Sequence, residues 1–171
     1  MEPKNAKKWL RVVAGVIVRE DAKVLIARRD GNSRIPFLWE YPGGKVEPGE
    51  SLRDCLKREL HEELNVEVCV GEWIGTVVHP YSFGVVELAA FFAFLRHGQP
   101  ECLEHLELKW VEVDELSGHE FPPADQPINR ALASQSGMAL FREWCKNGAK
   151  NCGKMNTEVF QPEVPVLGGK K

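Results

Sequence analysis

The sequence predicts a single α/β domain, and three features support that prediction. Short runs of β-branched and aliphatic residues alternate with turn residues, which is typical of strands. One longer segment places leucine at every fourth position, which is the spacing of an amphipathic helix. The 171 residues suffice for one domain with a buried core, and a second domain is not expected.

The chain begins with two predicted strands. Residues 12–18 and 24–27 are apolar runs separated by Arg19-Glu20-Asp21, which indicates a tight turn between them. Residues 30–36 (DGNSRIP) have the composition of a loop. Gly43-Gly44 follow, at a point where the backbone must take a path that a bulky side chain would resist.

Residues 51–64 have the pattern of a helix. Ser51 and Asp54 are spaced as in a capping box, which marks a helix start. Four leucines share one helical face: Leu52, Leu56, Leu60 and Leu64. Three carboxylates share another, because residues three and four apart are neighbours on a helix: Glu59, Glu62 and Glu63.

The second half of the chain predicts three more strands and a final helix. The strands lie near residues 73–78, 85–95 and 108–113, and the second of them is apolar enough to be central in a sheet. The amphipathic helix starts near Asp125 or Pro127 and its pattern reaches Trp144. We expect one domain over residues 8–146 and a flexible tail over residues 147–171, which are rich in Gly, Lys, Asn and Pro.

Charge and cysteine content exclude several classes of protein. A formal net charge of −3 argues against a nucleic acid polymer or an acidic membrane as partner, since both require a basic footprint. The apolar run after Arg11 is too short to span a bilayer, and no small-residue cleavage site follows it. The five cysteines are odd in number and lack metal-ligand spacing, which indicates reduced thiols in a cytoplasmic protein.

The three helical glutamates indicate a metal site. Like charges at this spacing cost about 0.2–0.5 kcal/mol per pair, so the arrangement does not stabilise a bare helix. A hard divalent cation such as Mg²⁺ or Mn²⁺ prefers oxygen ligands and also binds substrate phosphates. The alternative is an ordinary solvated acidic helix face.

The residues around this helix resemble the Nudix box, G-x5-E-x7-R-E-U-x-E-E-x-G-U, where U is a bulky aliphatic residue. The matching positions are Gly44, Glu50, Arg58, Glu59, Leu60, Glu62, Glu63 and Val66. Asn65 is the one departure, since the pattern has glycine there. This position lies just beyond the helix, where a left-handed conformation commonly ends it, and asparagine is the usual second choice. We expect fold and activity to survive the change.

The resemblance implies an α/β/α sandwich with a mixed β-sheet and a role for each residue of the box. Glu59, Glu62 and Glu63 would be metal ligands, together with the backbone carbonyl of Gly43. Gly44 would support the site structurally. Glu50 and Arg58 would form an ion pair that orients the helix and the loop before it.

Outside the box, the chain is similar to MutT-like nucleoside triphosphate pyrophosphohydrolases over residues 10–135. Segment 39–47 (WEYPGGKVE) is similar to theirs, so Lys45 would approach substrate phosphate. Glu104, six residues before Trp110, resembles a late glutamate of MutT-like proteins and would be a metal ligand or general base. The FPPAD segment ends at Asp125, which would read the nucleobase. The alternative is a helix N-cap, and Asp125 could also fill both roles.

Two further residues are substrate-binding candidates by the same resemblance. Arg29 would lie near the base and Tyr41 would stack on it, with a surface arginine and a core tyrosine as the alternatives. An ionised Asp125 accepts two hydrogen bonds and suits guanine, whereas a protonated acid suits cytosine. Some pyrimidine nucleotide pyrophosphohydrolases also resemble this chain in having P-A-D, so the base remains open.

The expected activity is metal-dependent hydrolysis of a (deoxy)nucleoside triphosphate to the monophosphate and pyrophosphate. Glu59 or Glu104 would take the proton of the attacking water. The substrate would be an oxidised or modified nucleotide such as 8-oxo-dGTP, or a pyrimidine nucleotide. The alternatives are another nucleoside diphosphate derivative and a non-catalytic nucleotide-binding module.

Overall fold

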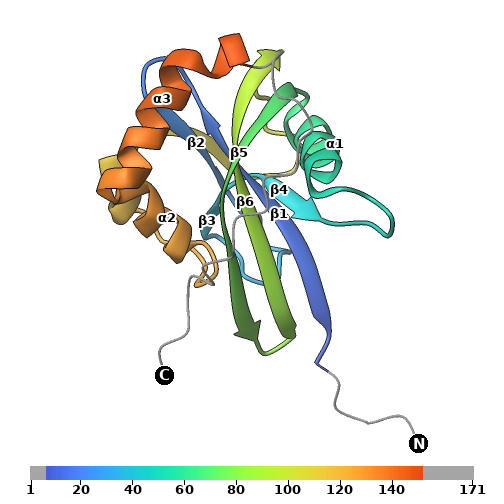
Figure 1. The fold of residues 1–171 in the computed structure, drawn as a ribbon. Coiled ribbons are helices and arrows are strands. Elements are labelled where there is room, and N and C mark those ends of the chain that lie inside the picture. Colours follow the sequence, from blue (N-terminus) through green and yellow to red (C-terminus); the bar gives the residue numbers. More distant parts are fainter. Residues whose placement is uncertain (1–6, 152–171) are drawn as a thin grey trace, which may run out of the picture.

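The computed structural model describes residues 7–151 and forms one sheet with helices on both faces (Figure 1). The elements follow in the order β1 (Trp9–Val18), β2 (Lys23–Arg28), β3 (Trp39–Glu40), β4 (Gly43–Lys45), α1 (Leu52–Leu64), β5 (Glu67–Tyr81), β6 (Gly84–His97), β7 (Glu107–Glu112), the 3-10 helix η1 (Val113–Gly118), α2 (Gln126–Ala133) and α3 (Gln135–Asn151).

The sheet is mixed, as predicted. β1 pairs in parallel with β6 along its whole length, and β6 pairs antiparallel with β5. The other edge of β1 is shared: residues 12–14 pair with β4, and Val18 pairs with Val24 of β2. β2 also carries β3 and β7. The apolar run predicted to be central is indeed β6, which is flanked by strands on both edges.

Two hydrophobic clusters fill the space between the sheet and the helices. Along β1, alternate side chains point to opposite faces, so Ala14 and Val16 join the cluster beneath α2 and α3. Val13 and Ile17 join the cluster beneath α1. Gly15 lies where a side chain would press on Leu60 at 3.1 Å, so α1 packs closely on β1. The three-layer α/β/α prediction is confirmed.

The predicted final helix is divided in two, which corrects the expectation of one continuous element. α2 stops at Ala133, and Ser134 adopts an extended backbone with ψ 159°. The Ser134 hydroxyl donates to Ala131 O at 2.7 Å and accepts from Gly137 N–H at 3.1 Å. Serine is a favoured N-cap, so one residue ends α2 and begins α3. α3 continues to Asn151, past the expected tail start at residue 147, and residues 152–171 lie outside the described part.

Other differences are of length. β5 is 15 residues long and has register shifts between Val70 and Gly75, which obscure the alternation that marks a strand. The two short strands β3 and β4 and the helix η1 had no recognisable pattern in the sequence.

No helix within residues 7–151 is long and apolar enough to cross a membrane. The reduced state of the cysteines stays a prediction, and Cys152 lies outside the described residues.

Candidate active site

Both ends of α1 are held by side chains that the sequence singled out. The Ser51 hydroxyl accepts from Asp54 N–H at 3.1 Å, so the predicted start of the helix is confirmed. Asn65 ends the helix in the left-handed conformation, with φ 53° and ψ 43°, as predicted for the glycine position. Its amide also donates to Glu101 Oε1 at 2.8 Å, a contact that glycine could not make.

The two glycines of β4 let the carboxylates of α1 reach the sheet. A Cβ at Gly44 would lie 2.2 Å from the Glu59 carboxylate, and one at Gly43 would lie 2.1 Å from Val13 O. The Gly43 N–H donates to Glu63 Oε2 at 3.1 Å. The structural role of Gly44 therefore has a direct steric reason. A metal contact from the Gly43 carbonyl stays a prediction.

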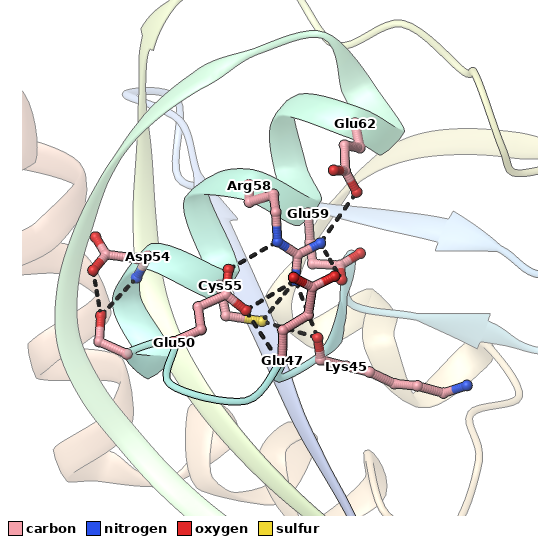
Figure 2. Close-up of polar contacts among 9 residues, drawn as sticks. Lys45, Glu47, Glu50, Asp54, Cys55, Arg58, Glu59 and Glu62 are labelled. Atoms are coloured by element: carbon pink, nitrogen blue, oxygen red, sulfur yellow. Dashed lines mark hydrogen bonds and ion pairs between the residues drawn. The ribbon is translucent and has the colours of Figure 1, made fainter.

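Arg58 is the centre of a polar network that joins α1 to the loop before it (Figure 2). Its guanidinium binds Glu50 through two contacts of 2.8 and 3.0 Å, so the predicted ion pair is confirmed. This pairing lowers the pKa of Glu50 to about 2. The same group donates to Lys45 O at 3.2 Å, whereas the ammonium of Lys45 extends away from Arg58. The loop over residues 45–50 is thereby clamped against α1.

Arg58 also holds two of the predicted metal ligands. Its Nη1 donates to Glu59 Oε1 at 2.8 Å and to Glu62 Oε2 at 3.2 Å. Glu62 is exposed, whereas Glu63 is buried on the face that points to β4. Arg58 is thus the cation that Glu59 and Glu62 share in this structure.

The carboxyl groups near the sheet have raised pKa values, because their ionised forms are unfavourable there. Burial, and then the negative charge of Glu40, raises the pKa of Glu63 to about 9. Burial also raises the pKa of Glu59, and the negative charges of Glu62 and Glu104 add to that shift. The charge of Glu104 acts on Glu63 as well, and the loop that carries Glu104 contacts α1 through Leu103 N–H, which donates to Glu63 O at 3.3 Å.

The donor set suits a hard divalent cation in its chemistry. Carboxylate oxygens are the preferred ligands of Mg²⁺ and Mn²⁺, and a cation would relieve the unfavourable charging of Glu59 and Glu63. Residues 7–151 contain no group of three or more His, Cys, Asp or Glu side chains arranged as a ready metal site. The assignment of Glu59, Glu62, Glu63 and Glu104 as ligands therefore stays a prediction.

A cavity of about 410 Å³ connects the box with the more distant candidates. The predicted residues that line it are Arg29, Tyr41, Gly43, Gly44, Lys45, Glu63 and Asp125. The lining does not include Glu59, Glu62 or Glu104. The sequence did not identify Tyr81 and Phe83, which stack with ring centroids 5.0 Å apart on another wall of the cavity.

Asp125 lies in this cavity and also occupies the N-cap position of α2. Its side chain makes no capping hydrogen bond, whereas its backbone carbonyl accepts from Ile128 N–H at 3.0 Å. Asp125 is 8% exposed, and burial raises its pKa to about 8, with the negative charge of Glu40 adding to the shift. An acid in this state is able to donate a hydrogen bond as well as accept one.

Tyr41 combines the two roles that the sequence left open. It is 3% exposed and its hydroxyl donates to Asn129 Oδ1 at 2.6 Å, so it belongs to the core. Its ring also lies 5.6 Å from that of Phe121 and borders the cavity. Stacking of the ring on a nucleobase stays a prediction.

Glu40 is the main charged residue that the sequence reasoning missed. One carboxylate oxygen pairs with Arg29 Nη1, and the other lies 3.0 Å from His105 Nε2. Arg29 is therefore ion-paired at the cavity, which excludes a free surface arginine. Glu40 stands in segment 39–47, yet its partners lie 11 and 65 residues away, so no local spacing identifies them.

The mixed sheet, the acidic helix capped at both ends and the glycines beneath it define one class of protein. The NUDIX domain profile matches residues 9–133, and the chain belongs to the Nudix hydrolase family. The CTP pyrophosphohydrolase of Escherichia coli K12 is 40% identical over 125 residues, which cover 73% of this chain and 92% of that protein.

Two further similarities support the assignment. The 8-oxo-dGTP diphosphatase of Haemophilus influenzae is 31% identical over 133 residues, covering 76% of this chain and 96% of that enzyme. The solution structure of the E. coli ORF135 protein superposes with a TM-score of 0.66 at 38% identity, covering 81% of this chain and 94% of that one. The predicted family, fold and enzyme class are therefore confirmed.

Proposed function

We propose that this Nudix hydrolase converts a (deoxy)nucleoside triphosphate to the nucleoside monophosphate and pyrophosphate with Mg²⁺ or Mn²⁺. The substrate is a free nucleotide in the cytoplasm, and hydrolysis would remove oxidised or modified nucleotides from the pool. Relatives named for CTP and for 8-oxo-dGTP both support a nucleotide substrate.

The observation that carries this proposal is the composition of the cavity wall. Glu63 and Lys45 from the box line the same 410 Å³ cavity as the buried Asp125. A nucleotide needs both kinds of group, because its phosphates are anionic and its base offers a pattern of donors and acceptors. One ligand can therefore contact the acidic helix and Asp125 together.

At the phosphate end, residues of this chain would bind the metal and the phosphates and orient the attacking water. Glu59, Glu62, Glu63 and Glu104 would hold the metal, which when bound neutralises phosphate charge and favours attack by water. Lys45 donates to a phosphate oxygen. Glu59 or Glu104 accepts the proton of the water. Arg58 fixes the position of Glu59 relative to the loop over residues 45–50, because it donates to both.

At the base end, Asp125 supplies the recognition group. With a pKa of about 8 it is largely protonated at pH 7 before substrate binds. A protonated acid donates one hydrogen bond and accepts another, which matches the N3 and N4-amino edge of cytosine and also the O6 and N1–H edge of guanine. Both pyrimidine and 8-oxoguanine nucleotides therefore belong in the substrate test.

A panel of nucleotides tests the proposal. Canonical, 8-oxo and 5-methyl nucleoside triphosphates are compared by kcat/KM with Mg²⁺ and Mn²⁺, and pyrophosphate is distinguished from phosphate as product. We expect metal-dependent release of pyrophosphate, with a marked preference for one base. Release of a sugar phosphate from a nucleoside diphosphate sugar would move the activity to the other Nudix substrate class. Tight nucleotide binding without hydrolysis would indicate a binding module.

A further inference from the structure

The loop between β6 and β7, residues 98–106, carries Glu104 and is anchored at both ends. On the α1 side, Glu101 N–H donates to Leu64 O at 2.9 Å and Leu103 N–H donates to Glu63 O at 3.3 Å. On the β2 side, Leu106 N–H donates to Arg28 O at 2.9 Å. Glu104 therefore stands between the C-terminal end of the acidic helix and the end of β2.

His105 is the buried side chain of this loop. Its side chain is 5% exposed, and its Nε2 lies 3.0 Å from Glu40 Oε1. Its Nδ1 is buried without a hydrogen-bond partner among the described residues. The neighbours Leu103 and Leu106 are 55% and 54% exposed, so they do not anchor the loop through apolar burial.

Burying an imidazole with one ring nitrogen unsatisfied is unfavourable. A loop stabilised only for packing would instead bury one of its leucines. The contact that compensates is the one with Glu40, whose other oxygen pairs with Arg29 at the cavity wall. The residue next to Glu104 is thus tied to the wall of the substrate cavity.

We propose that His105 is a positioning residue: its contact with Glu40 holds the loop so that Glu104 faces Glu59 and Glu63 of α1. The proposal rests on the proposed function, because it assumes that Glu104 serves hydrolysis. His105 does not line the cavity and is not among the proposed metal ligands. It acts through Glu104. Because Glu40 contacts both His105 and Arg29, it connects the position of the loop to the cavity wall.

The test is a double-mutant cycle between His105 and Glu104. Misplacement of a catalytic group by about 1 Å costs up to about 100-fold in rate, so His105→Ala is expected to lower kcat by about 10- to 100-fold. KM should change by less than about threefold, since substrate contacts remain. In the Glu104→Gln background the same His105→Ala change should cost less than about twofold, because residues acting as one unit are not additive.

Two further variants separate positioning from general damage. His105→Gln keeps a donor at similar reach from Glu40 and is expected to restore most of kcat. His97→Ala removes an exposed histidine at the start of the same connection and should leave activity unchanged. Hydrogen exchange gives a readout independent of activity: His105→Ala should accelerate exchange at Leu103, whose N–H reaches Glu63 O, while the exchange of β6 stays slow.

Each outcome either supports or rejects the positioning role of His105. A full loss from His105→Ala in the Glu104→Gln background, or an unchanged kcat in the wild-type background, would overturn the positioning role. Failure of His105→Gln to restore kcat, with unfolding at a lower temperature in both variants, would reduce His105 to a structural residue. If the wild-type chain hydrolyses no nucleotide, the proposed function fails, and unchanged hydrogen exchange at Leu103 would still reject the anchoring by His105.

Discussion

Glu63 and Asp125 are two buried acids in one cavity, and they differ in their surroundings. Glu63 lies on α1, and the negative charges of Glu40, Glu59 and Glu104 act on it. Asp125 lies before α2 among Tyr41, Ala124 and Pro122, and Arg29 partly offsets its charge. Burial is the largest cause of the raised pKa in both cases.

We infer from this difference that the same chemical group would serve two tasks according to its neighbours. A cluster of carboxylates is relieved by a divalent cation, which carries enough charge for several of them. Asp125 lies outside that cluster, with the charges of Glu40 and Arg29 acting on it in opposite directions. Such an acid is relieved by taking up a proton, after which it can bind a ligand through hydrogen bonds. Four experiments test this distinction.

The largest effect is expected from Glu63→Gln. The variant keeps the size and the contact with Gly43 N–H but removes a charge from the cluster, so kcat should fall by about 1,000-fold or more. The fold should remain intact, because an acid that is costly to ionise has been replaced by a neutral amide. Steady-state kinetics with Mg²⁺ and thermal unfolding measure the two parts. Activity near wild type would reject a metal role for Glu63.

Asp125→Ala is expected to act on binding instead. Loss of one or two hydrogen bonds from a buried side chain in the cavity should raise KM by about 10- to 100-fold with a small change in kcat. Asp125→Asn is the matched control, since it keeps the shape and alters only the donor and acceptor pattern. It should change base preference more than overall affinity. A loss of kcat at constant KM would place Asp125 with the catalytic carboxylates and remove the distinction.

Arg58→Lys tests the network around the acidic helix. Lysine keeps the charge but cannot bind Glu50 through two parallel contacts while also reaching Glu59 and Lys45 O. We expect kcat to fall by about 10-fold, because the loop over residues 45–50 and Glu59 lose their common anchor. The ratio of KM for a nucleotide with an altered base to KM for the parent nucleotide should be the same in Arg58→Lys as in wild type. A change in that ratio would mean that the network extends to Asp125.

A separate effect is the dependence of stability on pH without metal. The folded pKa values are about 9 for Glu63 and about 8 for Asp125, far above those of the unfolded chain. Between those limits the folded state binds more protons than the unfolded state, so stability falls as pH rises from about 4 to 9.

The same measurement separates the two acids. Glu63→Gln and Asp125→Asn should each reduce the loss of thermal stability on going from pH 6 to pH 9. Added Mg²⁺ at pH 8.5 should raise the unfolding temperature of wild type and of Asp125→Asn, but much less that of Glu63→Gln. Equal stabilisation of all three proteins would show that the metal binds without Glu63.

Structural features that depend on residues close together in the chain were predictable from the sequence. The helix over residues 51–64, its cap at Ser51, its left-handed end at Asn65 and the Glu50–Arg58 pair depend on neighbours within a few turns. The main strands were predictable for the same reason, since each has an apolar run of its own. The break at Ser134 was missed because the apolar periodicity continues across it into α3.

The match to the Nudix box was enough to identify the family from the sequence. The acidic helix was predictable because helix periodicity and capping are local. Which distant groups meet depends on tertiary packing. The register of β2 with β3 puts Glu40 beside Arg29, and the path of the β6–β7 loop brings His105 to the same carboxylate. Packing also decided that the carboxyl of the N-cap residue Asp125 lines the cavity with a raised pKa and makes no capping hydrogen bond, since desolvation depends on everything packed around a side chain.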